Sequence, residues 1–427
     1  MSSNIDSLII PGGWVNRALW KAAIFVLVML ACTVGRAQTL ALHDGDRVAF
    51  YGDSITAQRL YTRFTEDIFL TRYPQMHITF WNAGVPGDTV SGGYTGDRKA
   101  RLARDLFPQK PTVVTIMLGM NDGYYMPFNP KYLGIFEDGY RDLVHTIQSQ
   151  DPAARLTLIS TTPYDEVTHG TEFANYNGAV SRNAQFAREF AASQHFLFAD
   201  FYRAESDLLV AGHQRNASLA ALLVPDRIHP SEAAHWAMAA ELARTWGVSP
   251  VVSNVQLDAA QARALSTENA QVTDLALKDG TLTWTQLDNS LPLPLPLHDE
   301  MVQFVLANSK LSSMDQQSLR VASLPAQGYT LKIDDRVIGS FTREQLAAGV
   351  NLALLPTPME SQAREVDGIE EKRARLDLAG FNIAIEDPMV DGEEEAVRVI
   401  RLKDAALTEE QRRAAQPKPH RFELSPS

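Results

Sequence analysis

Residues 50–56 read Phe-Tyr-Gly-Asp-Ser-Ile-Thr, and this stretch decides the fold that the sequence predicts. The segment from Arg47 to Tyr51 is short, apolar and rich in aromatic side chains, which is typical of a buried strand. A helical pattern begins directly after it, so Ser54 is expected where a strand ends and a helix starts. At such a position the turn fixes the serine hydroxyl, and the backbone N–H groups at the start of the helix can bind an anion. In isolation, Gly-Asp-Ser also fits an ordinary turn, in which Asp and Ser hydrogen-bond the local backbone.

Strand-like and helix-like segments alternate over residues 40–248, which predicts a parallel sheet with crossover helices. The expected strands are short apolar runs at 47–52, 77–81, 112–118, 155–159 and 195–198. The expected helices are amphipathic segments at about 60–73, 98–106, 132–148, 172–192 and 231–246.

Polar residues follow the predicted strands where each strand ends. Ser54 follows the first strand. The second strand is followed by residues 82–89, Asn-Ala-Gly-Val-Pro-Gly-Asp-Thr, and the third by residues 119–122, Gly-Met-Asn-Asp. The loop before the last helix carries residues 226–229, Asp-Arg-Ile-His. Ligands bind at the carboxyl edge of open parallel sheets, so we expect these groups to converge. Serine, glycine N–H, asparagine amide and an Asp–His pair are the components of an acyl-transfer site.

These four segments, in this order, resemble the consensus blocks of the SGNH (GDSL) hydrolase superfamily. The resemblance covers residues 40–248 and implies a flavodoxin-like three-layer α/β/α domain of a serine esterase, similar to carbohydrate esterases. It implies that Ser54 is the nucleophile, His229 the base and Asp226 its orienting partner. The sequence has no Gly-x-Ser-x-Gly, so the α/β-hydrolase elbow is not the template.

The resemblance also implies an oxyanion hole made of the N–H groups of Ser54 and Gly87 and the side-chain amide of Asn121. A serine hydroxyl is a poor nucleophile until an imidazole takes its proton, and a carboxylate can hold the ring tautomer. Losing one oxyanion donor typically costs about 2.7–4 kcal/mol of barrier. Taken singly, residues 121–123 (Asn-Asp-Gly) also fit a turn, and His229-Pro230-Ser231 a helix entry.

Further residues are candidates to line the substrate pocket, although they match no block. They are Asp88, Tyr94, Met120, Tyr164 and His169. No histidine pair has the spacing of a zinc site on a predicted helix, so we expect neither a metal ion nor another cofactor.

The residue pattern changes beyond Pro250, and the new pattern predicts a β-rich accessory domain at 250–390 and a charged tail at 391–427. Polar and apolar residues alternate as in half-buried strands. The prolines of 291–296 require an extended segment outside any sheet. We expect strands at 281–285 and 318–324, a hairpin over 329–341 turning at Asp334-Asp335, and a helix at 359–376. The helical tail is expected to lie loosely on the surface.

The first residues, 1–37, are predicted to be a secretory signal peptide. Arg17 and Lys21 precede the apolar run 22–31, and small residues follow. This run is shorter than the roughly 20 residues that a transmembrane helix needs. We therefore expect a secreted or periplasmic protein with no integral membrane span in its mature form. The alternatives are an uncleaved N-terminal anchor and a lipid attached to Cys32, the only cysteine.

The formal charge of the 427-residue chain is −12. Cleavage after residue 37 removes three basic residues and one acidic residue, which makes it −14. So acidic a protein is not expected to bind nucleic acid or an anionic membrane.

The expected activity is hydrolysis of a carboxylic ester, most simply an O-acetyl group on a small-molecule or polysaccharide substrate such as a carbohydrate or cell-wall polymer. Alternatives at the same site are a lysophospholipase, a thioesterase or an acyltransferase. A glycan-binding protein with an idle hydrolase domain is a further alternative from another class.

Overall fold

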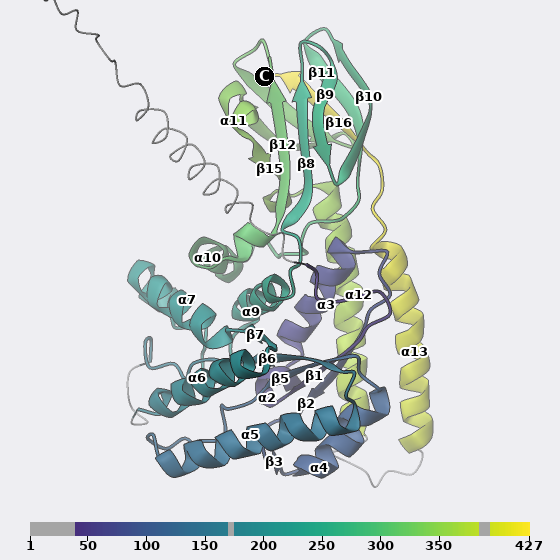
Figure 1. The fold of residues 1–427 in the computed structure, drawn as a ribbon. Helices are drawn as coiled ribbons and strands as arrows, with labels where there is room; N and C mark the ends of the chain where they lie inside the picture. The colour runs from purple at the N-terminus through teal and green to yellow at the C-terminus, as the bar shows by residue number, and fades with distance from the viewer. Residues whose placement is uncertain (1–38, 170–174, 384–392) are drawn as a thin grey trace, which may run out of the picture. The chain divides into compact units, whose positions relative to one another are not determined.

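A computed structural model describes residues 39–169, 175–383 and 393–427 of the chain (Figure 1). The predicted signal peptide, with Cys32, lies outside the described residues. None of the helices in these ranges combines the length and the hydropathy that a bilayer crossing needs.

A five-stranded parallel sheet forms the centre of the first domain, in the order β2-β1-β5-β6-β7. This is the flavodoxin-like order that the resemblance implied. Gly52 pairs with Gly84 on one side and with Met117 on the other, so three strands end at the same level. The loops that follow them therefore start side by side. The strands are β1 (Arg47–Gly52), β2 (Thr79–Gly84), β5 (Val113–Met117), β6 (Arg155–Ile159) and β7 (Leu197–Ala199).

Helices cover both faces of this sheet, which makes three layers (Figure 1). Side chains alternate between the faces of a strand. Val48 and Phe50 thus join the core under α3 and α9, whereas Ala49 and Tyr51 join the core under α5 and α6. The helices are α2 (Ser54–Ala57), α3 (Leu60–Arg72), α4 (Arg98–Arg101), α5 (Pro130–Gln150), α6 (Asn177–Gln194), α7 (Phe201–Arg215), α8 (Ala217–Ala220) and α9 (Glu232–Thr245). Short elements complete this part: β3 (Gly92–Gly93), β4 (Gly96–Asp97), η1 (Leu102–Leu106) and η2 (Phe107–Gln109).

The second domain is built of two sheets, in the orders β10-β11-β16-β13-β14 and β15-β12-β8-β9. Their inner faces share one apolar core. The predicted hairpin at Asp334-Asp335 is confirmed. The strands are β8 (Val251–Asp258), β9 (Arg263–Glu268), β10 (Ala270–Lys278), β11 (Thr281–Asp288), β12 (Gln316–Ala322), β13 (Gly328–Ile333), β14 (Arg336–Thr342), β15 (Val350–Asn351) and β16 (His420–Pro426). The helices among them are α10 (Glu300–Asn308), η3 (Leu311–Met314), α11 (Arg343–Ala348) and η4 (Leu352–Leu354).

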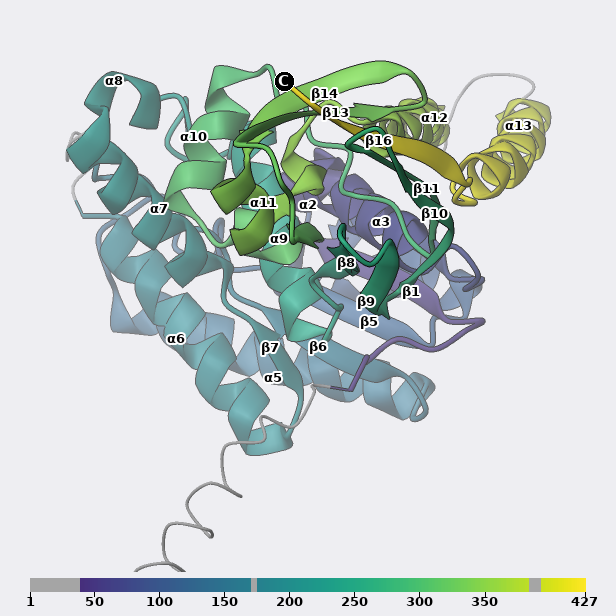
Figure 2. The same ribbon diagram turned by 90° about the horizontal axis from the view of Figure 1, so that it is seen from above.

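The expectation of a loosely attached tail is wrong. The last strand, β16, lies between β11 and β13, in the middle of its sheet (Figure 2). Phe422 is buried and stacks on Trp284, with ring centroids 4.9 Å apart. Burial of this aromatic pair and the two ladders of backbone hydrogen bonds explain why the charged tail is fixed.

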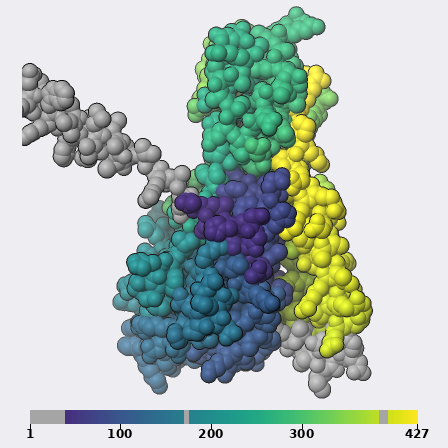
Figure 3. Space-filling model, turned by 45° about the vertical axis from the view of Figure 1, so that its right-hand side comes forward, coloured from purple at the N-terminus to yellow at the C-terminus, as the bar shows by residue number. Residues whose placement is uncertain are grey.

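Two long helices, α12 (Pro358–Phe381) and α13 (Glu393–Ala414), lead to this last strand. Arg373 of α12 pairs with Glu66 of α3, with Glu370 and with Asp404 of α13. Figure 3 shows the yellow C-terminal residues against the purple and blue residues near the start of the described chain. The C-terminal helices thus bind the outer side of the first domain.

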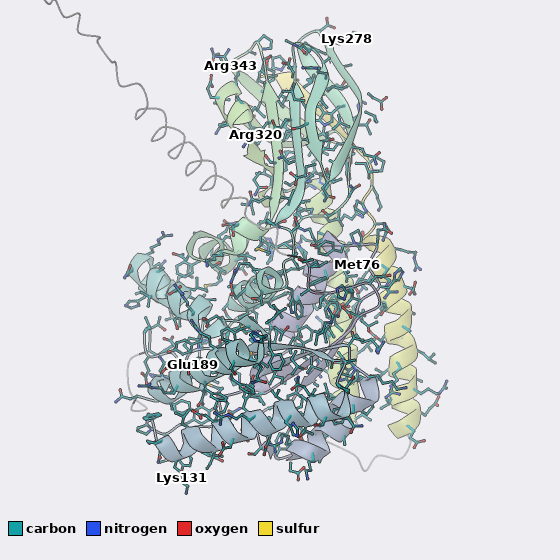
Figure 4. All side chains as sticks on the ribbon, viewed as in Figure 1. Met76, Lys131, Glu189, Lys278, Arg320 and Arg343 are labelled. Carbon is teal, nitrogen blue, oxygen red and sulfur yellow. The ribbon has the colours of Figure 1, made fainter. Side chains whose placement is uncertain are left out.

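The two domains are also joined by a buried ion pair and a proline-rich segment. Arg72 of α3 lies 3.3 Å from Asp315, and both side chains are inaccessible to solvent. As expected, the proline-rich segment 291–296 lies outside the sheets, and its Leu293 joins the core of the first domain. Charged side chains such as Lys131 and Glu189 project from the helices into solvent (Figure 4).

Candidate active site

Ser54 is the first residue of α2, and Asp53 alone separates it from the end of β1 at Gly52. Asp53 caps this helix, because its carboxylate accepts the N–H of Ile55 at 3.0 Å. Burial raises the pKa of Asp53 to about 8. Gly52 has no room for a side chain, since an added Cβ would lie 2.1 Å from the hydroxyl of Thr56. The local sequence therefore packs α2 tightly on β1 and fixes Ser54 at the sheet edge.

His229 faces Ser54 from the loop before α9. Its Nε2 lies 2.8 Å from the Ser54 Oγ, and its Nδ1 lies 2.7 Å from the Asp226 Oδ2. An ionised carboxylate only accepts, so Nδ1 carries the proton and Nε2 is free to accept one from the serine. The Asp226 side chain is 56% exposed and that of His229 30% exposed, so the site opens to solvent. The three residues thus have the arrangement that general-base activation of a serine requires.

A tight turn brings Asp226 and His229 together. The Asp226 Oδ1 accepts the N–H groups of Ile228 at 3.0 Å and of His229 at 2.7 Å. Partial burial acts to raise the pKa of Asp226, but the hydrogen bonds from the His229 N–H and ring and from Ile228 lower it. Arg227 has φ +73°, a left-handed conformation that is uncommon for a side chain of this size. Its guanidinium donates to the carbonyl of His169 at 2.6 Å, which holds the turn.

The three expected oxyanion donors approach the same edge. The N–H of Ser54 has no partner inside its helix, because it is the first helical residue. Gly87 has φ +73°, which a residue without Cβ adopts readily, and it is exposed. Asn121 is 8% exposed and donates one N–H to the carbonyl of Asp88 at 2.9 Å. An amide has two such donors, so one is left for a ligand.

Arg101, which no sequence motif points to, supports this edge. It is buried and donates to the Asp88 carboxylate at 2.6 Å and to the carbonyl of Ala83 at 3.0 Å. It also pairs with Asp105 and lies over the ring of Tyr51, 4.9 Å from its centroid. Arg101 therefore holds the ends of β1 and β2 and the loop between Ala83 and Asp88 in one arrangement.

An open hollow of about 300 Å³ adjoins the site. Its lining residues are Tyr125, Tyr164, Pro225, Asp226, Arg227 and Ile228.

The structure places the five residues that were expected to line the pocket in different surroundings. Tyr164 lines the hollow, but Asp88 and Met120 are fully buried, so the expectation that they line it is wrong. His169 contacts the carbonyl of Val224 at 3.0 Å and so supports the loop of Asp226. Tyr94 is 65% exposed and outside the lining. Among the residues that the structure describes, no three His, Cys, Asp or Glu side chains are grouped to hold a metal ion.

Comparison with known proteins gives the same class as the fold. Residues 50–237 match the GDSL-like lipase/acylhydrolase family. The acetylxylan esterase of Geobacillus stearothermophilus is 28% identical in an alignment 229 residues long, which covers 49% of this chain and 97% of that enzyme. A solved gut microbial diltiazem-metabolizing enzyme superposes with a TM-score of 0.80 at 24% identity, over 92% of this chain and 100% of that one. This likeness extends over both domains and shows a shared fold.

The parallel sheet with its flanking helices and the family match define an SGNH hydrolase. Together, the match of residues 50–237 and the related esterase identify the protein as a serine hydrolase of ester bonds.

Proposed function

We propose that this hydrolase removes O-acetyl groups from carbohydrate or cell-wall substrates through an acyl-serine intermediate on Ser54. The chain of contacts from the Ser54 Oγ to His229 and on to Asp226 carries the proposal. Distances of 2.8 and 2.7 Å are those of working hydrogen bonds between nucleophile, base and orienting group.

In the first half-reaction, the Ser54 Oγ attacks the ester carbonyl carbon while His229 Nε2 takes the hydroxyl proton. The carbonyl oxygen becomes negative and accepts hydrogen bonds from the N–H groups of Ser54 and Gly87 and from the Asn121 amide. Asp226 stabilises the imidazolium that forms. The bond to the alcohol oxygen then breaks, and His229 gives its proton to that oxygen, which releases the sugar hydroxyl.

In the second half-reaction, water attacks the acyl-serine. His229 now takes a proton from water and returns it to the Ser54 Oγ as the intermediate collapses. The products are acetate, the free serine and a proton released to solvent at neutral pH. The open setting of His229 and Asp226 lets water reach the intermediate without a lid movement.

The substrate class rests on likeness and on shape. The relative named acetylxylan esterase aligns over 97% of its own length, so the likeness spans a whole enzyme of this kind. The hollow beside Asp226 is open and has a volume of about 300 Å³, and the tyrosines Tyr125 and Tyr164 line it. A small acyl group on a polymer suits such a site better than a long fatty acid, which needs a deep apolar channel.

We also infer export of the protein, on the basis of the basic-apolar-small order of residues 1–37. Expression in a bacterial host and mass measurement of the N-terminal peptide from the exported fraction test this inference. A mature N-terminus near residue 38 is expected. An intact N-terminus retained in the membrane fraction would contradict it.

The activity is tested with 4-nitrophenyl esters of rising acyl length and with acetylated xylo-oligosaccharides. We expect the highest kcat/KM for the acetyl ester, release of acetate, and loss of both activities in Ser54→Ala but not in Ser193→Ala, an exposed serine of α6. A rate that peaks at eight carbons or more would refute the acetylesterase. Transfer of acetyl to a sugar acceptor in place of water would instead indicate an acyltransferase.

A further inference from the structure

Two consecutive tyrosines next to the site have an unusual backbone. Tyr124 has φ +54° and Tyr125 has φ +56°, both in the left-handed region that bulky residues rarely adopt. The turn is held by the N–H of Tyr124, which donates to the carbonyl of Asn121 at 3.0 Å, and by the N–H of Met126, which donates to Gly123 at 3.1 Å. Such strain persists only where the surroundings impose it, and it is concentrated at functional sites.

The turn carries the Tyr125 hydroxyl back to Asn121. That hydroxyl donates to the Asn121 Oδ1 at 2.8 Å, while the Asn121 Nδ2 donates to the carbonyl of Asp88 at 2.9 Å. A carbonyl only accepts, so Asp88 and Tyr125 specify the same orientation of the amide. The amide is held at both ends, and the second N–H of Nδ2 keeps one direction.

The ring of Tyr125 is itself supported. It packs on Tyr176, with centroids 5.0 Å apart, and Tyr176 is buried and donates its hydroxyl to the carbonyl of Met120. Tyr164 packs edge-on against the Tyr176 ring, with centroids 5.3 Å apart. Tyr125 is 41% exposed, and the packing of its ring on Tyr176 keeps its hydroxyl beside Asn121, as the support of a preorganised donor needs to be.

We propose that Tyr125 is a positioning residue of the oxyanion hole, which orients the Asn121 amide so that its free N–H meets the developing negative oxygen. This inference rests on the proposed function, because it needs the Asn121 amide to be an oxyanion donor. Without the Tyr125 hydroxyl, one hydrogen bond alone holds the amide, and orientations that present its oxygen to the oxyanion become populated.

The Tyr125 phenol keeps its proton over the pH range in which such an enzyme works. Burial, with smaller effects from Asp53 and Asp226, raises the pKa of Tyr125 to about 12. The hydroxyl therefore remains a donor to Asn121 at neutral and mildly alkaline pH.

The test is a double-mutant cycle between Tyr125→Phe and Asn121→Ala, measured on full-length protein with 4-nitrophenyl acetate. Tyr125→Phe is expected to lower kcat about 3- to 10-fold with KM unchanged, which is the usual effect of one neutral hydrogen bond. Asn121→Ala is expected to lower kcat about 100-fold or more. The double variant is expected to match Asn121→Ala, because there is no amide left to orient.

The matched control is Tyr124→Phe, the same chemical change one residue away. Tyr124 is 57% exposed, and its ring contacts Tyr132 on α5. We expect unchanged kcat and KM. Melting temperatures of all variants are measured, and kinetics are taken well below them.

Three results would overturn the proposal. The first is an unchanged kcat in Tyr125→Phe. The second is a further loss of the same factor when Tyr125→Phe is added to Asn121→Ala, which means independent action. The third is a raised KM with unchanged kcat, which means a substrate contact. Failure of the proposed function is distinguishable, because Ser54→Ala would then keep wild-type hydrolysis.

Discussion

The substitution Asp226→Asn tests how much the carboxylate contributes to catalysis. Asp226 lies 2.7 Å from the His229 ring, but its side chain is 56% exposed. Two unit charges at this separation attract each other by about 1.5 kcal/mol at the dielectric constant of water and about 3 kcal/mol at half that value. Each 1.36 kcal/mol corresponds to a tenfold change in rate, so kcat is expected to fall about 10- to 200-fold.

This expected loss is smaller than the roughly 10⁴-fold loss measured where the aspartate of such a triad is buried. The assay is steady-state hydrolysis of 4-nitrophenyl acetate at low and at moderate salt, with the melting temperature as a check of folding. Glu189→Gln, which neutralises an exposed carboxylate on α6, is the control. A kcat within twofold of wild type would refute the role of Asp226. A loss as complete as that of Ser54→Ala would refute the argument from solvent screening.

Three predictions concern stability. Burial raises the pKa of Asp53 to about 8 from 3.8, so between these values the folded protein holds a proton that the unfolded chain has lost, and stability falls as pH rises. The melting temperature of Asp53→Asn relative to wild type should therefore be higher at pH 8.5 than at pH 5; a constant difference in calorimetry would contradict this. Arg72→Met leaves Asp315 buried without its partner, and we expect urea unfolding to show a free energy of unfolding lower by about 3–5 kcal/mol. A decrease below about 1 kcal/mol would argue against burial of the pair. Phe422→Ala should destabilise the β-rich domain by about 3–5 kcal/mol and red-shift the fluorescence of Trp284; an unchanged spectrum would place the last strand elsewhere.

The parallel sheet could be predicted because its central strands are buried on both faces and read as apolar runs. Residues 113–117, Val-Val-Thr-Ile-Met, are an example, and the strand occurs where the run predicts it. The second strand was placed too early, at 77–81, whereas β2 is Thr79–Gly84. Its last three residues, Asn-Ala-Gly, are poor strand formers, and pairing with β1 overrides that preference.

The position of β16 could not be predicted, because its stability comes from partners far away in the sequence. His420–Pro426 contains charged residues and a proline, and Phe422 gains its stabilisation from β11 and β13. Tertiary pairing of this kind has no local signal beyond a short alternation of Phe and Leu.

Arg101 shows why part of the site could not be predicted from the sequence. Residues 98–101 read Arg-Lys-Ala-Arg, a pattern typical of a solvated helix. The Ala83 carbonyl and the Asp88 carboxylate that make burial of Arg101 favourable come from β2 and from the loop that follows it. Tyr125 is similar, since its role depends on a left-handed backbone that sequence preferences do not predict. The residues of the four blocks could be named in advance, but the residues that hold them could not.

The most direct test of the account is covalent labelling with a fluorophosphonate, because only an activated serine reacts rapidly with such a reagent. The account predicts one adduct per chain on the peptide that contains Ser54, with labelling slowed at least tenfold in His229→Ala and with loss of esterase activity in proportion to the label. An adduct on another serine, or an active enzyme that resists the reagent, would contradict it.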